Sequence, residues 1–319
     1  MATIKDISRR AEVSPATVSR VLNRDDGISV SPEVRNRIFT IAHELNYVPP
    51  RLRHHSGTSF VIGVADWHII RNGCENTKLS SLECLTKTLN IPGDVSFVRI
   101  RMGEAATVDG IIAFGAINEA ELSFLQEMSF SIVFINSEKR DYLFDRIVMD
   151  YEEGIVQAVH YLVEQGYDTI GYLGGIFQQD EVTIGSHRLD CFVDILKKNN
   201  RWDPALIHVG ALSKEGGYHL MMHALQNKTL ARAVVLGSDE IAEGALQALH
   251  ERNIRIPEDV ALVLYRDIET LPQGELRYPT IRMYPDFVWE TAIKLLMDRI
   301  LGKRNEAMTV YVPAKFERL

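Results

Sequence analysis

The sequence is poor in cysteine. Cys74, Cys84 and Cys191 are the only three in 319 residues, and none belongs to a C-x-x-C pair. Such an odd and scattered set argues against a disulfide framework and a structural zinc site, and it fits a reducing compartment. The sequence also has no apolar run as long as a membrane span, and its first residues lack the apolar stretch of a signal peptide. We therefore expect a cytoplasmic protein with no membrane partner.

The motifs of common catalytic sites are absent as well. The chain has no G-x-x-x-x-G-K-[ST] phosphate loop, no G-x-G-x-x-G, no H-E-x-x-H metal motif and no G-x-S-x-G nucleophile turn. The glycine cluster at 171–175 is typical of a turn that follows a strand. The ten histidines are scattered, apart from His54 and His55. These absences predict a protein that is not an enzyme and has no catalytic residues, metal site or cofactor.

Charge is unevenly distributed along the chain, which carries a net charge of −8. Residues 1–56 contain nine Lys and Arg against six Asp and Glu, a charge of +3, whereas the remainder carries −11. A small basic segment on an acidic body indicates that only the N-terminal segment meets nucleic acid phosphates. The length of 319 residues and the apolar content of 46% predict two or three folding units with large cores.

The N-terminal 45 residues show three short helical patterns. Ile7 and Ala11 lie on one face of the first pattern at helical spacing. Ser-Pro pairs at 14–15 and 31–32 are typical helix starts, because serine caps the helix and proline needs no N–H donor in the first turn. Residues 46–59 contain two prolines, a glycine, two arginines and two histidines, which predicts a linker.

From residue 60 on, short β-branched runs alternate with amphipathic helical patterns. This alternation predicts an α/β fold of doubly wound parallel sheets with helices on both faces, in two lobes. The predicted strands are 60–65, 95–100, 108–114, 131–135, 169–173, 232–236 and 260–264, and the predicted helices are 77–89, 119–128, 152–165, 183–198, 213–226, 240–252 and 286–301.

The pattern also predicts where the domains lie. We expect a three-helix DNA-binding domain at 1–46, a linker at 47–59 and a two-lobed core at 60–319. The expected first lobe comprises about 60–149 and 285–308, and the second about 150–284 and 309–319. The helix and strand that follow residue 285 should therefore pass between the lobes.

Residues 3–22 have the spacing of a helix-turn-helix, whose second helix reads the major groove. Thr-Val-Ser-Arg-Val-Leu-Asn at 17–23 and Asn-Tyr-Val-Pro at 46–49 resemble the signature of the lactose/galactose-repressor family, and the resemblance extends over essentially the whole chain. The short first lobe before residues 108–112 and the run at 239–246 are similar to the evolved β-galactosidase repressor subgroup. The resemblance implies a periplasmic-binding-protein-like core. It also implies a homodimer that represses sugar (galactoside-type) utilisation genes, binding pseudo-palindromic operator DNA and a small sugar or sugar phosphate.

The resemblance places Pro15, Ala16 and Arg20 at the base-reading positions of the recognition helix. Arg20 can donate two hydrogen bonds to a guanine, whereas the two apolar residues can only touch a thymine methyl group. We therefore expect Arg20 to supply most of the direct readout. The other expected DNA contacts, many of them to phosphates, are Thr3, Ser14, Thr17, Ser19, Asn23, Tyr47, Arg51, Leu52 and Arg53.

The linker departs from the family pattern. Family members fold it into a short helix on DNA and insert a leucine into the minor groove, which kinks the duplex. Here the linker is about one residue shorter, and His54 and His55 stand near the expected wedge position, with Leu52 as its only leucine. Either Leu52 still acts as a wedge, or the linker is a flexible basic tether. The two histidines either make DNA binding pH-dependent or are simply solvated.

Polar and aromatic side chains follow the predicted strands at their carboxyl ends, where open α/β sheets bind ligands. Their types suit a sugar, whose hydroxyls and ring face need planar polar groups and aromatic rings. The resemblance implies that Arg188 holds sugar hydroxyls. Asp239 either lines the site or caps a helix, and Trp67 either stacks on the sugar or packs in a core or interface. The expected ligand-binding residues are Trp67, His68, Phe114, Asn136, Arg188, Asp239 and Arg266.

Arg266 is a second departure, because relatives carry Asp or Asn there and arginine can only donate hydrogen bonds. Arg266 either joins Arg188 in binding an anionic ligand or pairs with Asp267 or Glu269 and leaves a pocket for a neutral sugar. The sequence favours the second alternative.

A dimer is expected because one helix-turn-helix covers half of a two-fold symmetric site. The resemblance places the helix after Asn76 and the segment 276–279 in the dimer interface, although Tyr278 alternatively packs on its own lobe. Effector binding should shift the lobes and release the heads from DNA, although action as a co-repressor is an open alternative. The rival class is a sugar-binding or sugar-processing protein whose head does not bind DNA.

Overall fold

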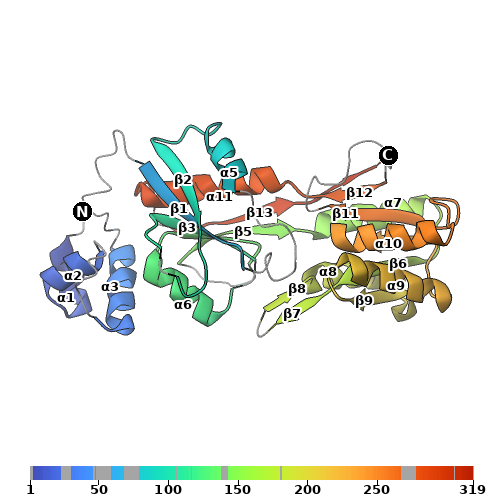
Figure 1. Cartoon of the computed structure of the whole chain (residues 1–319), viewed down its shortest axis with the longest axis horizontal. Helices are drawn as coiled ribbons and strands as arrows, with labels where there is room; N and C mark the ends of the chain where they lie inside the picture. Colours follow the sequence, from blue (N-terminus) through green and yellow to red (C-terminus); the bar gives the residue numbers. More distant parts are fainter. Residues whose placement is uncertain are drawn as a thin grey trace. The chain divides into compact units, whose positions relative to one another are not determined.

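The computed structural model describes residues 3–22, 30–45, 47, 59–67, 79–104, 106–115, 117–137, 143–179, 182–266, 278–304 and 306–318. The chain divides into two compact units. The first comprises Met1–Ile147 and Asp286–Val310, and the second comprises Val148–Pro285 and Tyr311–Leu319. Figure 1 shows the helices and strands of both units.

Three short helices form the N-terminal head, as the sequence predicted. They are α1 (Ile4–Ala11), α2 (Pro15–Leu22) and α3 (Pro32–Glu44). A small core joins them, with Ile7, Val18 and Ile38 fully buried at its centre. The head therefore places one apolar stripe of each helix inside and leaves the opposite face of α2 outside.

The first unit also contains a six-stranded sheet in the order β13-β5-β4-β3-β1-β2. The pairs from β2 to β5 are all parallel, as expected for an α/β fold. Its helices are α5 (Leu79–Thr86), α6 (Glu119–Met128) and α11 (Pro285–Ile300), and its strands are β1 (Ser59–Ala65), β2 (Asp94–Arg99), β3 (Gly110–Phe114), β4 (Ile132–Ile135), β5 (Asp145–Asp150) and β13 (Thr309–Pro313).

The second unit contains a six-stranded sheet in the order β14-β12-β11-β10-β6-β9 and the hairpin β7-β8. The sheet is parallel except for its edge strand β14, which runs antiparallel to β12. The helices are α7 (Glu152–Glu164), α8 (Ser186–Lys198), η2 (Pro204–Leu206), α9 (Lys214–Gln226) and α10 (Asp239–Glu251), and the strands are β6 (Ile170–Gly175), β7 (Phe177–Gln179), β8 (Val182–Ile184), β9 (Ile207–Gly210), β10 (Ala233–Leu236), β11 (Ala261–Arg266), β12 (Thr280–Arg282) and β14 (Lys315–Glu317).

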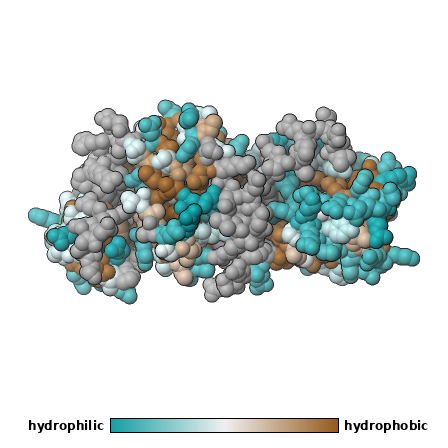
Figure 2. Space-filling model, viewed as in Figure 1, coloured by the Kyte–Doolittle hydropathy of each residue, from teal (hydrophilic) through white to brown (hydrophobic). Residues whose placement is uncertain are grey.

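Helices cover both faces of the second sheet. Leu262 and Leu264 of β11 belong to a buried cluster with Ile241 and Ala245 of α10. On the other face, Gly154 of α7 lies against Ile281 of β12. This is the doubly wound arrangement that the sequence predicted. Figure 2 shows that the visible face of this unit is mainly hydrophilic, whereas hydrophobic residues gather over the strands of the first unit.

The structure corrects two details of the predicted elements. The helix expected at 183–198 begins only at Ser186, because residues 182–184 form the second strand of a hairpin and Gly185 turns the chain with a φ of 93°. Gly174 and Gly175 lie inside β6 and not in a turn after it. Among the helices of the described ranges, none is long and apolar enough to cross a membrane.

Candidate functional site

The second helix of the head presents a short side-chain surface to solvent. The Ser14 hydroxyl caps α2, since its Oγ accepts a hydrogen bond from the Thr17 N–H at 3.0 Å and lies 2.8 Å from the Thr17 hydroxyl. Val18 and Val21 are buried, and Pro15, Ala16 and Arg20 are exposed. Because residues four apart lie on one helical face, Ala16 and Arg20 form the outer ridge of α2. This is the ridge that a major groove can receive.

The first helix begins with a reciprocal cap between Thr3 and Asp6. The Thr3 hydroxyl and backbone N–H both donate to Asp6 Oδ2, at 2.6 and 2.9 Å, and Thr3 Oγ1 accepts from the Asp6 N–H at 3.3 Å. These hydrogen bonds from Thr3 are the main reason that the pKa of Asp6 is lowered. Thr3 therefore fixes the start of α1.

The remaining predicted DNA contacts fall into two groups. Ser19 and Tyr47 are half-buried, and Tyr47 packs on the core of the head. Asn23, Arg51, Leu52 and Arg53 lie outside the described residues, as do the linker histidines. The wedge and tether alternatives for the linker therefore stay as predictions.

In the second unit, Arg188 occupies the first turn of α8 and is only 9% exposed. Its Nη1 donates a hydrogen bond to the Gly237 carbonyl oxygen at 2.8 Å. The guanidinium carbon lies 5.0 Å from the centre of the Tyr265 ring and 5.7 Å from that of Tyr151. Aromatic faces attract cations at such distances, so these contacts hold the guanidinium in one place.

Two glycines make room beside this arginine. A Cβ atom at Gly174 or at Gly237 would collide with the Tyr172 side chain. Tyr172 is buried and lies against Phe192 of α8, with ring centres 5.1 Å apart. Glycine at both positions therefore lets one tyrosine ring lie at the carboxyl ends of β6 and β10, next to the carbonyl that Arg188 binds.

The cap of α10 is Ser238, whose side chain accepts a hydrogen bond from the Ile241 N–H at 3.3 Å. The helix includes Asp239 as its first residue, so the expectation that it starts at Glu240 with Asp239 as a possible cap is wrong. Asp239 is half-buried at the carboxyl end of β10. Its assignment to the ligand site stays a prediction.

Arg266 and Arg188 approach the sheet from opposite faces. Tyr265, which contacts Arg188, is in register with Ile281 and so shares the face covered by α7. Successive side chains of a strand alternate between faces, so Arg266 points to the face that Leu264 shares with α10. Asp267 and Glu269, the alternative partners of Arg266, lie outside the described residues.

In the first unit, the structure favours the core alternative for Trp67. This side chain is 5% exposed, its indole N–H donates to the Ile100 carbonyl oxygen at 2.7 Å, and its ring lies 6.2 Å from that of Phe124. A ring with its N–H satisfied inside a packed cluster is a core residue. The carboxylate of the neighbouring Asp66 also has a structural partner, since it is fully buried and accepts a hydrogen bond from Arg99 Nη1 at 2.6 Å.

Phe114 and Asn136 follow the expected placement at the ends of adjacent strands. Phe114 ends β3, is half-buried and stacks on Trp289 of α11 with ring centres 6.1 Å apart. Asn136 follows β4 with a φ of 54°, a conformation that asparagine tolerates better than most residues. His68 lies outside the described residues.

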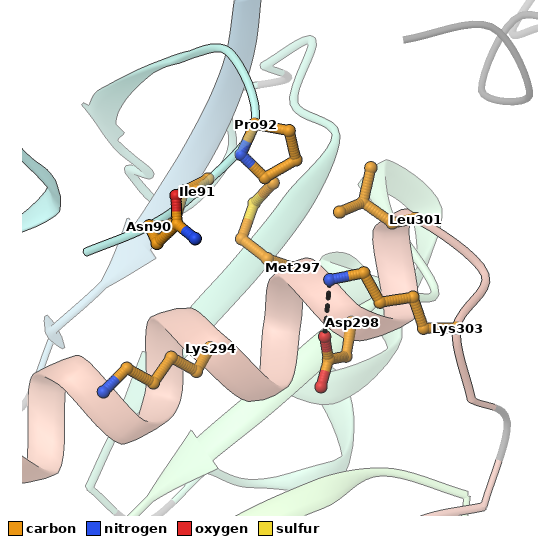
Figure 3. A pocket seen from close by; sticks show the side chains of 8 residues that line it. All are labelled: Asn90, Ile91, Pro92, Lys294, Met297, Asp298, Leu301 and Lys303. Atoms are coloured by element: carbon orange, nitrogen blue, oxygen red, sulfur yellow. Dashed lines mark ion pairs between the residues drawn. The ribbon is translucent and has the colours of Figure 1, made fainter.

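A small hollow of about 230 Å³ lies elsewhere in the first unit. It is formed between the last turns of α11 and the loop that precedes β2, and Figure 3 shows Met297 between them and the ion pair of Lys303 with Asp298 at 3.3 Å. Its lining residues are Asn90, Ile91, Pro92, Lys294, Met297, Asp298, Leu301 and Lys303. None of these is a predicted ligand-binding residue.

Sequence reasoning missed the aromatic neighbours of Arg188. Tyr151 precedes α7, Tyr172 lies in β6 and Tyr265 lies in β11, so only the tertiary fold brings them together. The signal that could have indicated Tyr172 is the glycine spacing around it at 171, 174 and 175. Glycines beside a buried aromatic indicate a close approach of backbone to ring.

An exposed recognition helix in a three-helix head, attached to two α/β units, defines a DNA-binding transcription regulator with a ligand-sensing core. Residues 3–50 match the family described as bacterial regulatory proteins, lacI family, and residues 159–318 match the periplasmic binding protein-like domain. The chain belongs to the LacI family of bacterial regulatory proteins. It is a regulator and not an enzyme, and the predicted family and fold class are confirmed.

Relatives of this chain match over nearly their full length. The HTH-type transcriptional regulator GanR of Bacillus subtilis strain 168 is 32% identical, with 99% of this chain and 98% of the relative aligned. The HTH-type transcriptional repressor MelR of the same organism is 30% identical, with 95% and 92% aligned.

Solved structures show the same fold. The transcriptional regulator CelR in complex with cellobiose has a TM-score of 0.66 at 21% identity, covering 100% of this chain and 99% of that one. The Lac repressor dimer bound to operator and the anti-inducer ONPF has a TM-score of 0.62 at 20% identity, covering 99% and 98%.

Proposed function

We propose that this regulator represses sugar-utilisation genes, of the galactoside type, and that a small sugar changes its affinity for operator DNA. The observation that carries the proposal is the exposed ridge of Ala16 and Arg20 on α2. Solved relatives support it, because one is bound to operator and another to cellobiose.

On DNA, we assign base reading to Pro15, Ala16 and Arg20. We assign phosphate contacts to Thr3, Ser14, Thr17, Ser19, Asn23 and Tyr47 of the head and to Arg51 and Arg53 of the linker. Leu52 contacts DNA in the alternative in which it acts as the minor-groove wedge. The capping bonds of Ser14 and Thr3 support their role, since a fixed helix start presents its N–H groups to a phosphate.

The sensor is the pair of α/β units. We assign Arg188 of the second unit to the sugar hydroxyls. Asp239, Phe114, Asn136 and His68 are further candidate ligand-binding residues. Arg188 is supported by its burial and by the three contacts that fix its guanidinium. A preorganised donor loses less entropy on binding than a mobile one, so such a residue suits ligand recognition.

The regulator acts in the cytoplasm. It acts as a homodimer, because two heads are needed for a two-fold symmetric operator. We assign α5 and the segment 276–279 to the dimer face. The Tyr278 side chain is half-buried and packs on the cluster of α9 and α10 in its own unit, which favours the alternative role for this residue, and burial raises its pKa. The division into a head at 1–46, a linker at 47–59 and a core at 60–319 is part of this proposal.

Selection of binding sites from a random duplex library by the full chain tests the proposal. The expected result is enrichment of pseudo-palindromic sites, whose binding weakens steeply with salt because several phosphates are contacted. A panel of galactose, lactose and cellobiose should then change the affinity of the selected sites. Enrichment of no sequence would favour a sugar-binding protein whose head does not bind DNA, and turnover of any sugar would favour an enzyme.

A further inference from the structure

Three cationic side chains form one row across three neighbouring strands of the second sheet. Arg266 of β11 is in register with Arg282 of β12, and Arg282 is in register with Lys315 of β14. Residues in register point to the same face of a sheet, and adjacent strands lie roughly 4.8 Å apart. The three positive groups are therefore neighbours on one face.

This row lies on the face of the sheet opposite α7. The residues beside it, Ile281 and Phe316, point the other way, since Ile281 lies against Gly154 of α7 and the Phe316 ring lies 5.2 Å from that of Tyr161. The Arg282 side chain is 42% exposed, and Lys315 is exposed as well.

The row also lies at the sheet edge where ligands bind in α/β folds. Arg266 and Arg282 are the last residues of β11 and β12, and Lys315 is the first residue of the antiparallel strand β14. All three therefore stand at the carboxyl edge of the parallel strands. Arg188 reaches the same edge from the opposite face, through its contact with Tyr265.

The row brings two arginines and a lysine together beside the carboxylate of Glu317. Arg282 Nη1 donates to Glu317 Oε1 at 3.4 Å, and Arg282 also lies 5.9 Å from the centre of the Tyr284 ring. The Nε atom of Arg266 is buried and has no hydrogen-bond partner among the described residues. Like charges at facing positions of adjacent strands repel one another, so a bound anion would stabilise this arrangement of cationic side chains.

We propose that Arg266, Arg282 and Lys315 bind the anionic group of the sugar effector, either a phosphate or a carboxylate. Arginine forks and a lysine ammonium are the donors that such groups prefer. Arg188 then serves the hydroxyls from the other face, so the two arginines act on different parts of one ligand. This inference rests on the proposed sugar-sensing function and names the chemical class of the effector.

Calorimetry on the full chain tests the row, with galactose, galactose 1-phosphate, galactose 6-phosphate and galacturonate as probes. The anionic forms should bind about tenfold more tightly than galactose, the effect of one charged hydrogen bond. Tight binding of the phosphates identifies a phosphate ligand, and tight binding of galacturonate alone identifies a carboxylate. Equal or tighter binding of galactose would overturn the inference and favour pairing of Arg266 with Asp267 or Glu269.

Two variants and a matched control show whether the row causes the tighter binding of anionic sugars. Arg282→Gln and Lys315→Gln should each remove most of the preference for the anionic sugar. Arg318→Gln is the control, because Arg318 follows the same strand but pairs with Glu164 of α7 at 3.2 Å, and it should keep the preference. A preference that survives both row variants contradicts the assignment.

A probe without a sugar covers the case in which no panel sugar binds. Inorganic phosphate should raise the melting temperature of the wild-type chain more than sodium chloride of equal ionic strength, and Lys315→Gln should abolish the difference. Equal melting temperatures of the wild type in phosphate and in sodium chloride would overturn the proposed anion site. Operator binding measured on the same samples separates the two ideas: DNA released by neutral sugars alone refutes only the row, whereas no DNA binding refutes the proposed function.

Discussion

The Nη1 group of Arg188 donates a hydrogen bond to the carbonyl oxygen of Gly237 at 2.8 Å. The bond joins the first turn of α8 to the segment between β10 and α10, two elements that lie far apart in the sequence. Gly237 must be glycine because its Cα faces the Tyr172 side chain. A side chain that touches effector would thus be coupled to the start of α10 through one bond.

Replacing Arg188 should weaken effector binding while leaving DNA binding intact. Arg188→Lys keeps the charge but loses the planar fork, so affinity for the effector should fall by about 1.5–3 kcal/mol, the typical value of a charged hydrogen bond. Titration of a fluorescent operator with effector measures the loss. Unchanged release of DNA by the effector in Arg188→Lys would remove this residue from the site.

The Tyr265 ring should matter to the effector and its hydroxyl should not. Tyr265→Phe keeps the face beneath Arg188, so effector affinity should stay as in the wild type. Tyr265→Leu removes a cation–π contact worth roughly 0.5–2 kcal/mol, and affinity should fall by about 2- to 30-fold. Phe316→Leu is the control for lost aromatic packing, because that ring contacts Tyr161 instead. Equal losses in Phe316→Leu and Tyr265→Leu would mean that the ring acts only through stability.

The buried carboxylate of Asp145 should be important for stability. It is fully buried and accepts hydrogen bonds from Arg299 Nε at 2.7 Å, from Arg304 Nη2 at 2.6 Å and from the Met308 N–H at 2.7 Å. Asp145→Asn leaves two arginines without their anion, which should cost about 3–5 kcal/mol in the free energy of unfolding.

Chemical denaturation of the full chain, followed by a signal that reports on the first unit, measures that cost. Asp259→Asn serves as the control, since Asp259 pairs with Arg255 on the surface and its removal should have a much smaller effect. Similar unfolding midpoints for the two variants would show that the Asp145 cluster does not hold α11 to the sheet.

Cys191 should react slowly with alkylating agents at neutral pH. Burial is the main cause that raises the pKa of its thiol to about 11, and the nearby carboxylates of Glu152 and Asp150 raise it further. Because the thiolate is the reactive form, labelling should stay slow at pH 8 and accelerate only as the pH approaches 11. Mass spectrometry after timed iodoacetamide treatment distinguishes Cys191 from the exposed Cys84. Fast labelling of Cys191 at pH 8 would contradict this environment.

The sequence predicts the helices better than the strands, for physical reasons visible in particular residues. Ser-Pro starts and amphipathic faces place α2, α3 and α6 almost to the residue. The strand β5 has no such signal, because its buried first residue is the charged Asp145. Two arginines and the Met308 N–H, all supplied by the distant C-terminal region, make a buried aspartate favourable there.

The same contrast separates the parts of the candidate site. Arg188 could be named from the family resemblance, whereas Tyr151 and Tyr265 could not, since their contacts arise from packing between α7, α8 and β11. For Trp67 the sequence position suggested a role in the ligand site that the packing does not support. Its position after the first strand suited a sugar site, but its N–H is satisfied by Ile100 inside the core.

Base reading by Arg20 gives a direct test of the central claim that α2 recognises operator DNA under the control of the core. The measurement is the affinity of wild-type and Arg20→Ala chains for a selected operator and for each of its single-base variants, with and without effector. Loss of discrimination at one base pair, worth roughly 1–3 kcal/mol, is predicted, together with an effector response that persists in the variant. An Arg20→Ala chain with the base preference of the wild type would contradict the account.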